Sequence, residues 1–152
     1  MPNPSKHFIS HPEVVHETND WTHNEWLCRP DIAEAERLLM VRARMKPRHC
    51  HPFHRHPHRE EIIHVLEGRA EQWVGEERRI LGPGEVAVIP PGVVHATYNP
   101  FDEPLVFHAI LSPAMLAPPL DADPDPCDVS GEAPWSTLRD GLTPCTLLRD
   151  DQ

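Results

Sequence analysis

The sequence has little glycine, few aromatic side chains and no long apolar run. Only 7 of the 152 residues are glycine, against 19 prolines, so long helices are disfavoured and turns must be frequent. No stretch is long and apolar enough to span a membrane, and the opening residues MPNPSKHFIS lack the apolar segment of a signal peptide. These absences predict a cytoplasmic protein with no membrane partner.

Positive charge is also scarce, since the net charge is −10, which argues against nucleic acid as a partner. The excess of acids lies in residues 1–36 and 112–152, whereas residues 37–111 carry ten Lys/Arg and nine Asp/Glu. We therefore expect a folded unit over 37–111, between an N-terminal extension and a Pro/Asp-rich C-terminal extension. The tryptophans of the extensions are expected to dock on this unit or on a second subunit: Trp21, Trp26 and Trp135.

Cysteine pairing is not evident from the spacing. The four cysteines, Cys28, Cys50, Cys127 and Cys145, contain no CxxC pair, and in a reducing compartment we expect free thiols. The sequence leaves open whether Cys127 and Cys145 pair in an oxidised sample.

The middle of the chain consists of short apolar and β-branched runs, separated by Gly, Pro, Asn and Asp. This punctuation is typical of strands in an all-β sandwich or barrel. One helical candidate, 31–40, precedes them, and its second half is β-like. The predicted strands are 37–45, 61–68, 69–75, 77–85, 86–92, 93–99 and 104–111.

The segment RHCHPFHRHPHREE, residues 48–61, contains five histidines and ends in two glutamates. His54 and His56 are two residues apart, so an extended chain places both on one face. Glu61 begins the next predicted strand, and His95 follows a Pro-Pro-Gly turn far downstream. Three imidazoles and a carboxylate converging from different strands would form a mixed N/O site suited to Mn, Fe, Ni, Cu or Zn.

These residues fit two spaced motifs of a known family, and residues 37–111 therefore resemble a small, single-domain, RmlC-like cupin. The first motif is G-x5-HxH-x3,4-E-x6-G, and only its opening glycine is missing, because Arg48 stands there. The second is G-x5-PxG-x2-H-x3-N, which is complete. The matching residues are His54, His56, Glu61 and Gly68 in the first motif and Gly84, Pro90, Gly92, His95 and Asn99 in the second.

The resemblance implies an all-β double-stranded β-helix (jelly-roll) barrel with irregular extensions. It also implies one divalent metal ion (Fe, Mn, Ni or Zn) held by His54, His56, Glu61 and His95. The neighbouring His49, His51 and His58 are expected to face water. Cys50 is expected to lie outside the ligand set, and His64 to be a packed or interface histidine.

No catalytic residue follows from the sequence, but two side chains are pocket candidates. His108 belongs to a strand expected to run through the barrel, and Gln72 shares a face with Ala70 and Val74. Each is alternatively a plain barrel residue. Members of the family with this ligand set include dioxygenases, decarboxylases, isomerases, lyases and proteins that only bind a ligand.

We therefore expect a metal-dependent enzyme, first of all a dioxygenase-type oxidoreductase, acting on a small, anionic, oxygen-rich substrate. Alternatives are a non-redox isomerase or lyase of a sugar or sugar acid, and a non-catalytic binding protein. The unpaired sheet edges and the N-terminal extension lead us to expect a homodimer.

Overall fold

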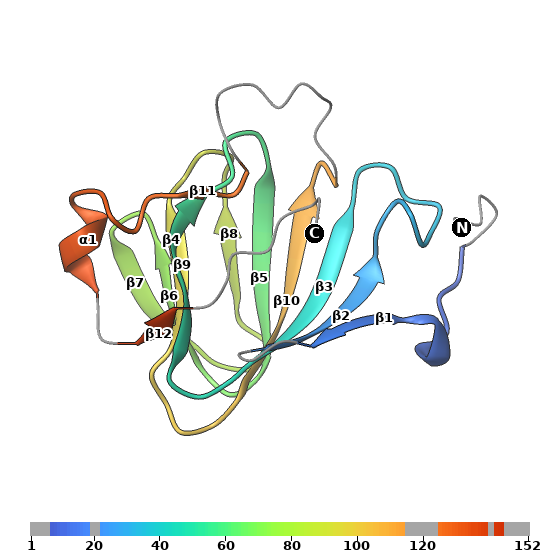
Figure 1. Cartoon of the computed structure of the whole chain (residues 1–152), viewed down its shortest axis with the longest axis horizontal. Helices are drawn as coiled ribbons and strands as arrows, with labels where there is room; N and C mark the ends of the chain where they lie inside the picture. Colours follow the sequence, from blue (N-terminus) through green and yellow to red (C-terminus); the bar gives the residue numbers. More distant parts are fainter. Residues whose placement is uncertain (1–6, 19–21, 115–124, 140–141, 145–152) are drawn as a thin grey trace.

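A computed structural model describes residues 7–18, 22–114, 125–139 and 142–144 of the protein. These residues form two β-sheets (Figure 1). One sheet has the strand order β1-β2-β3-β10-β5-β8, and the other has the order β11-β4-β9-β6-β7, with β12 also paired to β4. The strands are β1 Val15–Thr18, β2 Thr22–Cys28, β3 Leu39–Met45, β4 His49–Arg55, β5 Glu60–Glu67, β6 Ala70–Val74, β7 Glu77–Leu81, β8 Val86–Ile89, β9 His95–Asn99, β10 Leu105–Ser112, β11 Cys127–Asp128 and β12 Thr143–Pro144.

The predicted jelly-roll barrel is confirmed, and each predicted strand corresponds to a strand of the barrel. The helix considered for 31–40 does not form, because residues 31–38 are turns and bends and β3 begins at Leu39. Helical structure in the described residues is limited to a 3-10 turn, His11–Glu13, and the short helix α1, Trp135–Leu138. No helix among the described residues is long and apolar enough to cross a membrane.

The N-terminal extension is more regular than the sequence predicted, since β1 and β2 continue the first sheet beyond β3 (Figure 1). The side chains of β2 alternate, and Thr22, Asn24 and Trp26 are the buried ones. Thr22 Oγ1 donates to the carbonyl of Arg44 at 2.7 Å, and Asn24 Nδ2 donates to Glu17 Oε1 at 3.2 Å. These bonds satisfy polar groups that burial would otherwise penalise.

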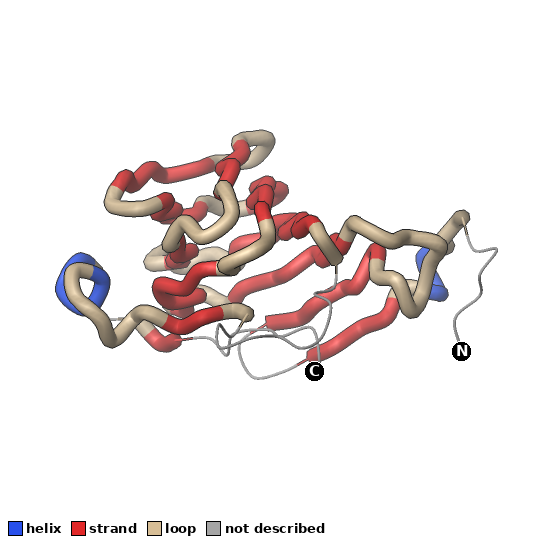
Figure 2. The backbone as a smooth tube through the Cα atoms, turned by 90° about the horizontal axis from the view of Figure 1, so that it is seen from above, coloured by secondary structure: helices blue, strands red, loops and turns tan. Residues whose placement is uncertain are grey.

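The described part of the C-terminal segment, residues 125–139 and 142–144, packs on the outer face of the second sheet. Phe53, Trp73 and Tyr98 form an apolar cluster there, and Trp135 lies 5.3 Å from Phe53 between ring centroids. Trp26 instead joins the barrel interior. Figure 1 shows the short helix α1 and the strands β1 and β2 at opposite ends of the molecule, and in Figure 2 the two helical segments, α1 and the 3-10 turn, likewise lie at opposite ends. Trp21 and Cys145 lie outside the described residues.

Two positions of the first motif explain how the chain turns. Gly68 has a φ of +77°, and a Cβ there would lie 2.3 Å from the carbonyl oxygen of Pro104, so a side chain is excluded. Arg48 stands where the motif has its opening glycine, and it still adopts the left-handed φ of 65°. Its guanidinium donates to the Pro100 carbonyl and to Asp102, each at 2.6 Å, which helps to hold this unfavourable backbone.

Candidate metal centre

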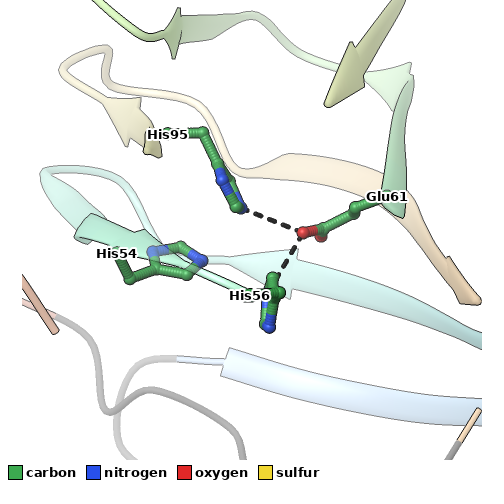
Figure 3. A group of neighbouring side chains, drawn as sticks. All are labelled: His54, His56, Glu61 and His95. Atoms are coloured by element: carbon green, nitrogen blue, oxygen red, sulfur yellow. Dashed lines mark hydrogen bonds and ion pairs between the residues drawn. The ribbon is translucent and has the colours of Figure 1, made fainter. Parts of the chain in front are cut away.

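Four buried side chains meet inside the barrel (Figure 3): His54, His56, Glu61 and His95. Their possible ligand atoms all lie within 4.8 Å of one another. His54 belongs to β4 and His56 follows it directly, while His95 opens β9 and pairs with His54 in the ladder. Glu61 comes from β5 in the other sheet, so the two sheets supply the imidazoles and the carboxylate separately.

A bulge in β4 directs the histidines inward. His51 pairs with Thr97 of β9, and His54 pairs with His95, so three steps along β4 oppose two steps along β9. An extra residue of this kind shifts the alternation of side chains by one position. Cys50 and Phe53 consequently pack in the outer cluster, whereas His51 and His54 both line the interior.

In each histidine of the cluster, Nδ1 lies within hydrogen-bond distance of an oxygen atom that does not belong to the four-residue cluster. His54 Nδ1 lies 2.7 Å from the carbonyl oxygen of Pro52, and His95 Nδ1 lies 3.0 Å from that of Val93. His56 Nδ1 lies 2.7 Å from Oδ1 of Asp125. Only a protonated Nδ1 can donate to these oxygens, so each Nε2 is left to act as a ligand.

The Nε2 atoms of two of these histidines converge on one carboxylate. His95 Nε2 lies 2.9 Å from Glu61 Oε1, and His56 Nε2 lies 3.3 Å from the same oxygen (Figure 3). Metal-ligating histidines commonly donate the other ring N–H to a carboxylate or a backbone carbonyl. The three imidazole nitrogens and the carboxylate thus fit a divalent transition metal in both donor type and orientation.

The electrostatics of the cluster favour the ligand forms of two residues. Burial alone would raise the pKa of Glu61, but hydrogen bonds with His56 and His95 hold it well below its usual value. Burial and the adjacent His95 and His56 place the pKa of His54 well below its usual value. Glu61 is therefore a carboxylate and His54 a neutral imidazole near pH 7.

The pKa of His56 shifts in the opposite direction to that of His54. Burial lowers its pKa, but hydrogen bonds with Asp125 and Glu61 outweigh burial and raise the pKa to about 9. In the absence of a metal, the proton on Nε2 occupies the position that a cation would take. Metal binding at this centre must therefore displace a proton.

The cavity beside the cluster is small, about 30 Å³. Its lining is mostly apolar, with Asn24, His51 and Thr97 as the polar side chains besides the cluster. His51, predicted to face water, is half-buried here, and its ring meets that of His54 edge-on at 5.6 Å between centroids. Space of this size holds one or two water molecules, so only a very small ligand fits without movement of the lining.

The two pocket candidates from the sequence have different positions. Gln72 is buried in the interior, where its Oε1 accepts a hydrogen bond from Thr97 Oγ1 at 2.7 Å. It also lines a second cavity of about 270 Å³ between β6, β7 and β8. His108 lies on the opposite face of β10 from Phe107 and Ala109, which line the small cavity, and its ring lies 5.7 Å from that of His64.

Among the other residues singled out from the sequence, His58 is exposed and Cys50 is buried in the outer cluster. Within the described residues no disulfide joins the cysteines Cys28, Cys50 and Cys127. Asp125 and Arg59 were not anticipated, and together they form a buried ion pair next to His56.

Comparison with known proteins gives one family. Residues 41–111 match the profile of the family described as Cupin domain. Germin-like protein 12-2 of Oryza sativa subsp. japonica is 37% identical over 86 residues, which are 49% of this chain and 38% of that protein. The matched region thus spans less than half the length of this relative.

Solved structures share the barrel. An RmlC-like cupin from Shewanella frigidimarina NCIMB 400 superposes with a TM-score of 0.62 at 21% identity, covering 72% of this chain and 93% of the other. The DMSP lyase DddQ from Ruegeria pomeroyi DSS-3 superposes with a TM-score of 0.59 at 25% identity, covering 68% of this chain and 58% of the other. The first structure shares the fold of this chain, and the second shares the fold and a quarter of the aligned residues.

Proposed function

We propose that this chain, which belongs to the cupin superfamily, is a metal-dependent enzyme acting on a small, anionic, oxygen-rich molecule. One divalent ion (Fe, Mn, Ni or Zn) would be held by His54, His56, Glu61 and His95. The observation that carries the proposal is the orientation of the three imidazoles, whose Nδ1 atoms are all engaged elsewhere. When bound, the cation supplies Lewis-acid or redox chemistry.

Charge supports an anionic ligand. Three neutral imidazoles and one carboxylate leave a divalent ion with a net charge of about +1. The remaining lining is mostly apolar, so an anion at the centre is attracted with little screening by solvent. If the bound ion is six-coordinate, the four protein ligands would leave coordination positions that a substrate oxygen could occupy.

The interior favours an enzyme over a protein that only binds. His51 lines the cavity beside His54, and an imidazole at this position can accept or return a proton of a bound molecule. Thr97, which lines the small cavity, and Gln72, which lines the larger one, add a buried polar pair to the interior.

We assign a dioxygenase-type oxidoreductase first, because open positions beside a redox metal suit both substrate and oxygen. The similarity to a DMSP lyase at 25% identity favours a second candidate, a non-redox lyase or isomerase. In that chemistry His51 would move the proton and the cation would stabilise the negative charge that develops on the substrate.

A panel of small carboxylates, enols and sugar acids, with Fe(II)-loaded protein in an oxygen electrode, separates the two reactions. Oxygen uptake that stops in His54→Ala but continues in His64→Ala supports the dioxygenase, since His64 lies outside the cavity. Product formation without oxygen, or with Zn(II), assigns a lyase or isomerase. Saturable binding without product under either condition contradicts an enzyme.

We also propose that two copies associate through the outer face of the first sheet. Ile62 of β5 and Val88 of β8 are paired residues on that face, with 37% and 63% of their surface exposed, and Val86 is 47% exposed. These apolar side chains adjoin the edge of β8, the last strand of this sheet in the described part of the chain. A second chain that covers them removes both an apolar patch and a sheet edge from water.

A further inference from the structure

A residue of the C-terminal segment reaches the centre from outside the barrel motifs. Asp125 precedes β11, which pairs with β4 so that Cys127 lies opposite Arg55 and Asp128 opposite His54. This pairing brings Oδ1 of Asp125 to 2.7 Å from Nδ1 of His56, 69 residues away in the sequence. The two side chains are only 2% and 8% exposed.

Arg59 holds Asp125 in this position. Its Nη2 donates to Asp125 Oδ1 at 2.5 Å, and its Nε donates to Oδ2 at 3.4 Å. Its Nη1 donates to the carbonyl oxygen of Ala114 at 3.3 Å. The guanidinium is 1% exposed, so it neutralises a buried carboxylate and ties it to the end of β10.

We propose that Asp125 is a positioning residue for the metal ligand His56, and that Arg59 fixes Asp125 for this task. The inference rests on the metal centre proposed above and assigns part of that centre to the C-terminal segment. By accepting the Nδ1–H of His56, Asp125 selects the tautomer whose Nε2 faces the cation, fixes the plane of the ring and strengthens Nε2 as a ligand.

The other two histidines show why this contact is special. His54 and His95 use carbonyls of Pro52 and Val93, two residues before them, so the local backbone alone sets their orientation. His56 lies one residue after the last residue of β4. Its hydrogen-bond partner is the charged carboxylate of Asp125, which lies far away in the sequence. The geometry of this ligand therefore depends on the carboxylate of Asp125.

Titration of purified metal-free protein with Co(II), in competition with a chromophoric chelator, tests the inference. We expect Asp125→Asn to weaken binding about 10- to 100-fold, as loss of such partners does elsewhere, and to change the visible spectrum of bound cobalt. The amide keeps the shape of the carboxylate but loses its charge, and one of its two positions then presents a donor to Arg59.

Two variants control for loosening of the segment. Val129→Ala removes apolar contact from the outer cluster, and Asp128→Asn alters an exposed carboxylate two residues before Ser130. Both should lower the thermal midpoint of the metal-free protein, or leave it unchanged, without changing cobalt affinity. Arg59→Lys keeps the charge but cannot contact both Asp125 and Ala114, so it should weaken cobalt binding, and it replaces Asp125→Asn if that variant does not fold.

Cobalt affinity and spectrum equal to wild type in Asp125→Asn, or in Arg59→Lys, would overturn the positioning role while leaving the metal centre intact. Equal losses in Val129→Ala would also overturn it, because the loss would then follow from undocking of the segment. A wild-type chain that binds no cobalt would instead overturn the metal centre itself, and the inference with it.

Discussion

His51 and His54 line the same cavity although they are three residues apart in one strand, where regular alternation would place them on opposite faces. The bulge of β4 against β9 causes this, because Thr97 and His95, their partners, are only two residues apart. Two imidazoles from one strand thereby face the interior, one oriented as a ligand and one beside it.

The placement of His51 predicts a separation of binding from turnover. His51→Asn should keep metal affinity close to that of the wild type, because His51 is not in the ligand cluster. The rate of any reaction that transfers a proton should fall by about 100-fold or more, the usual contribution of a general acid or base. Metal titration and steady-state kinetics on one preparation measure both; equal loss of metal would show that His51 is a ligand.

Metal affinity should rise with pH. Because hydrogen bonds raise the pKa of His56 to about 9 in the metal-free protein, a proton must leave Nε2 before a cation binds there. The proton is bound below about pH 9 and lost above it, so the apparent Kd falls by up to about tenfold per pH unit between pH 7 and 9 and then levels off. Calorimetry in buffers of different ionisation enthalpy counts the released protons; an affinity that is flat over this range would contradict the account.

Arg48 allows a test of backbone strain. Arg48→Gly and Arg48→Ala both lose the contacts with Pro100 and Asp102, but only glycine accommodates the φ of 65° without strain. The glycine variant should therefore be the more stable of the two by about 1 kcal/mol. Chemical denaturation measures the difference, and an alanine variant as stable as the glycine variant would contradict the strained backbone.

The proposed association predicts a change of mass. Wild-type protein at micromolar concentration should have the mass of a dimer in light scattering, and Val88→Asp should shift it to a monomer, because a buried unpaired charge opposes association. Ile80→Asp is the matched control, since Ile80 is 44% exposed on β7 of the other sheet. A monomeric wild type, or a dimer that tolerates Val88→Asp, would refute this interface.

Much of the centre was predictable because its ligands have fixed spacing in the barrel. His54 and His56 straddle the end of one strand, Glu61 is the second residue of the next, and His95 opens the strand paired with His54. The motifs therefore describe strand ends, which is where the sheets bring the four side chains together. The division of the chain at residues 36 and 112 remains a prediction.

Other features could not be predicted from the alternation of inward and outward side chains along a strand. His108 lies in the run LVFHAIL, which is apolar on both sides of the histidine and gives no sign of which face is inward. His51 was misplaced because the bulge reverses the alternation within β4. The buried residues Thr22 and Asn24 are polar, so the strand β2 had no apolar pattern from which it could be predicted.

The contact between Asp125 and His56 could not be predicted, because the two residues are far apart in the sequence. It lies in an acidic, proline-rich run that cannot form a core of its own, and only pairing of β11 with β4 gives it a partner. Contacts of this kind depend on tertiary packing, so no local pattern around residue 125 indicates them.

The central claim is that the four-residue cluster binds one divalent metal ion per chain, and elemental analysis of untagged protein tests it most directly. After incubation with Mn, Fe, Ni or Zn and removal of excess metal, we expect about one ion per wild-type chain. His95→Ala should retain little metal but a folded barrel, and His64→Ala, a histidine change outside the cavity, should retain the wild-type amount. Wild-type protein with only trace metal after every incubation, or His95→Ala with the full amount, would contradict the claim.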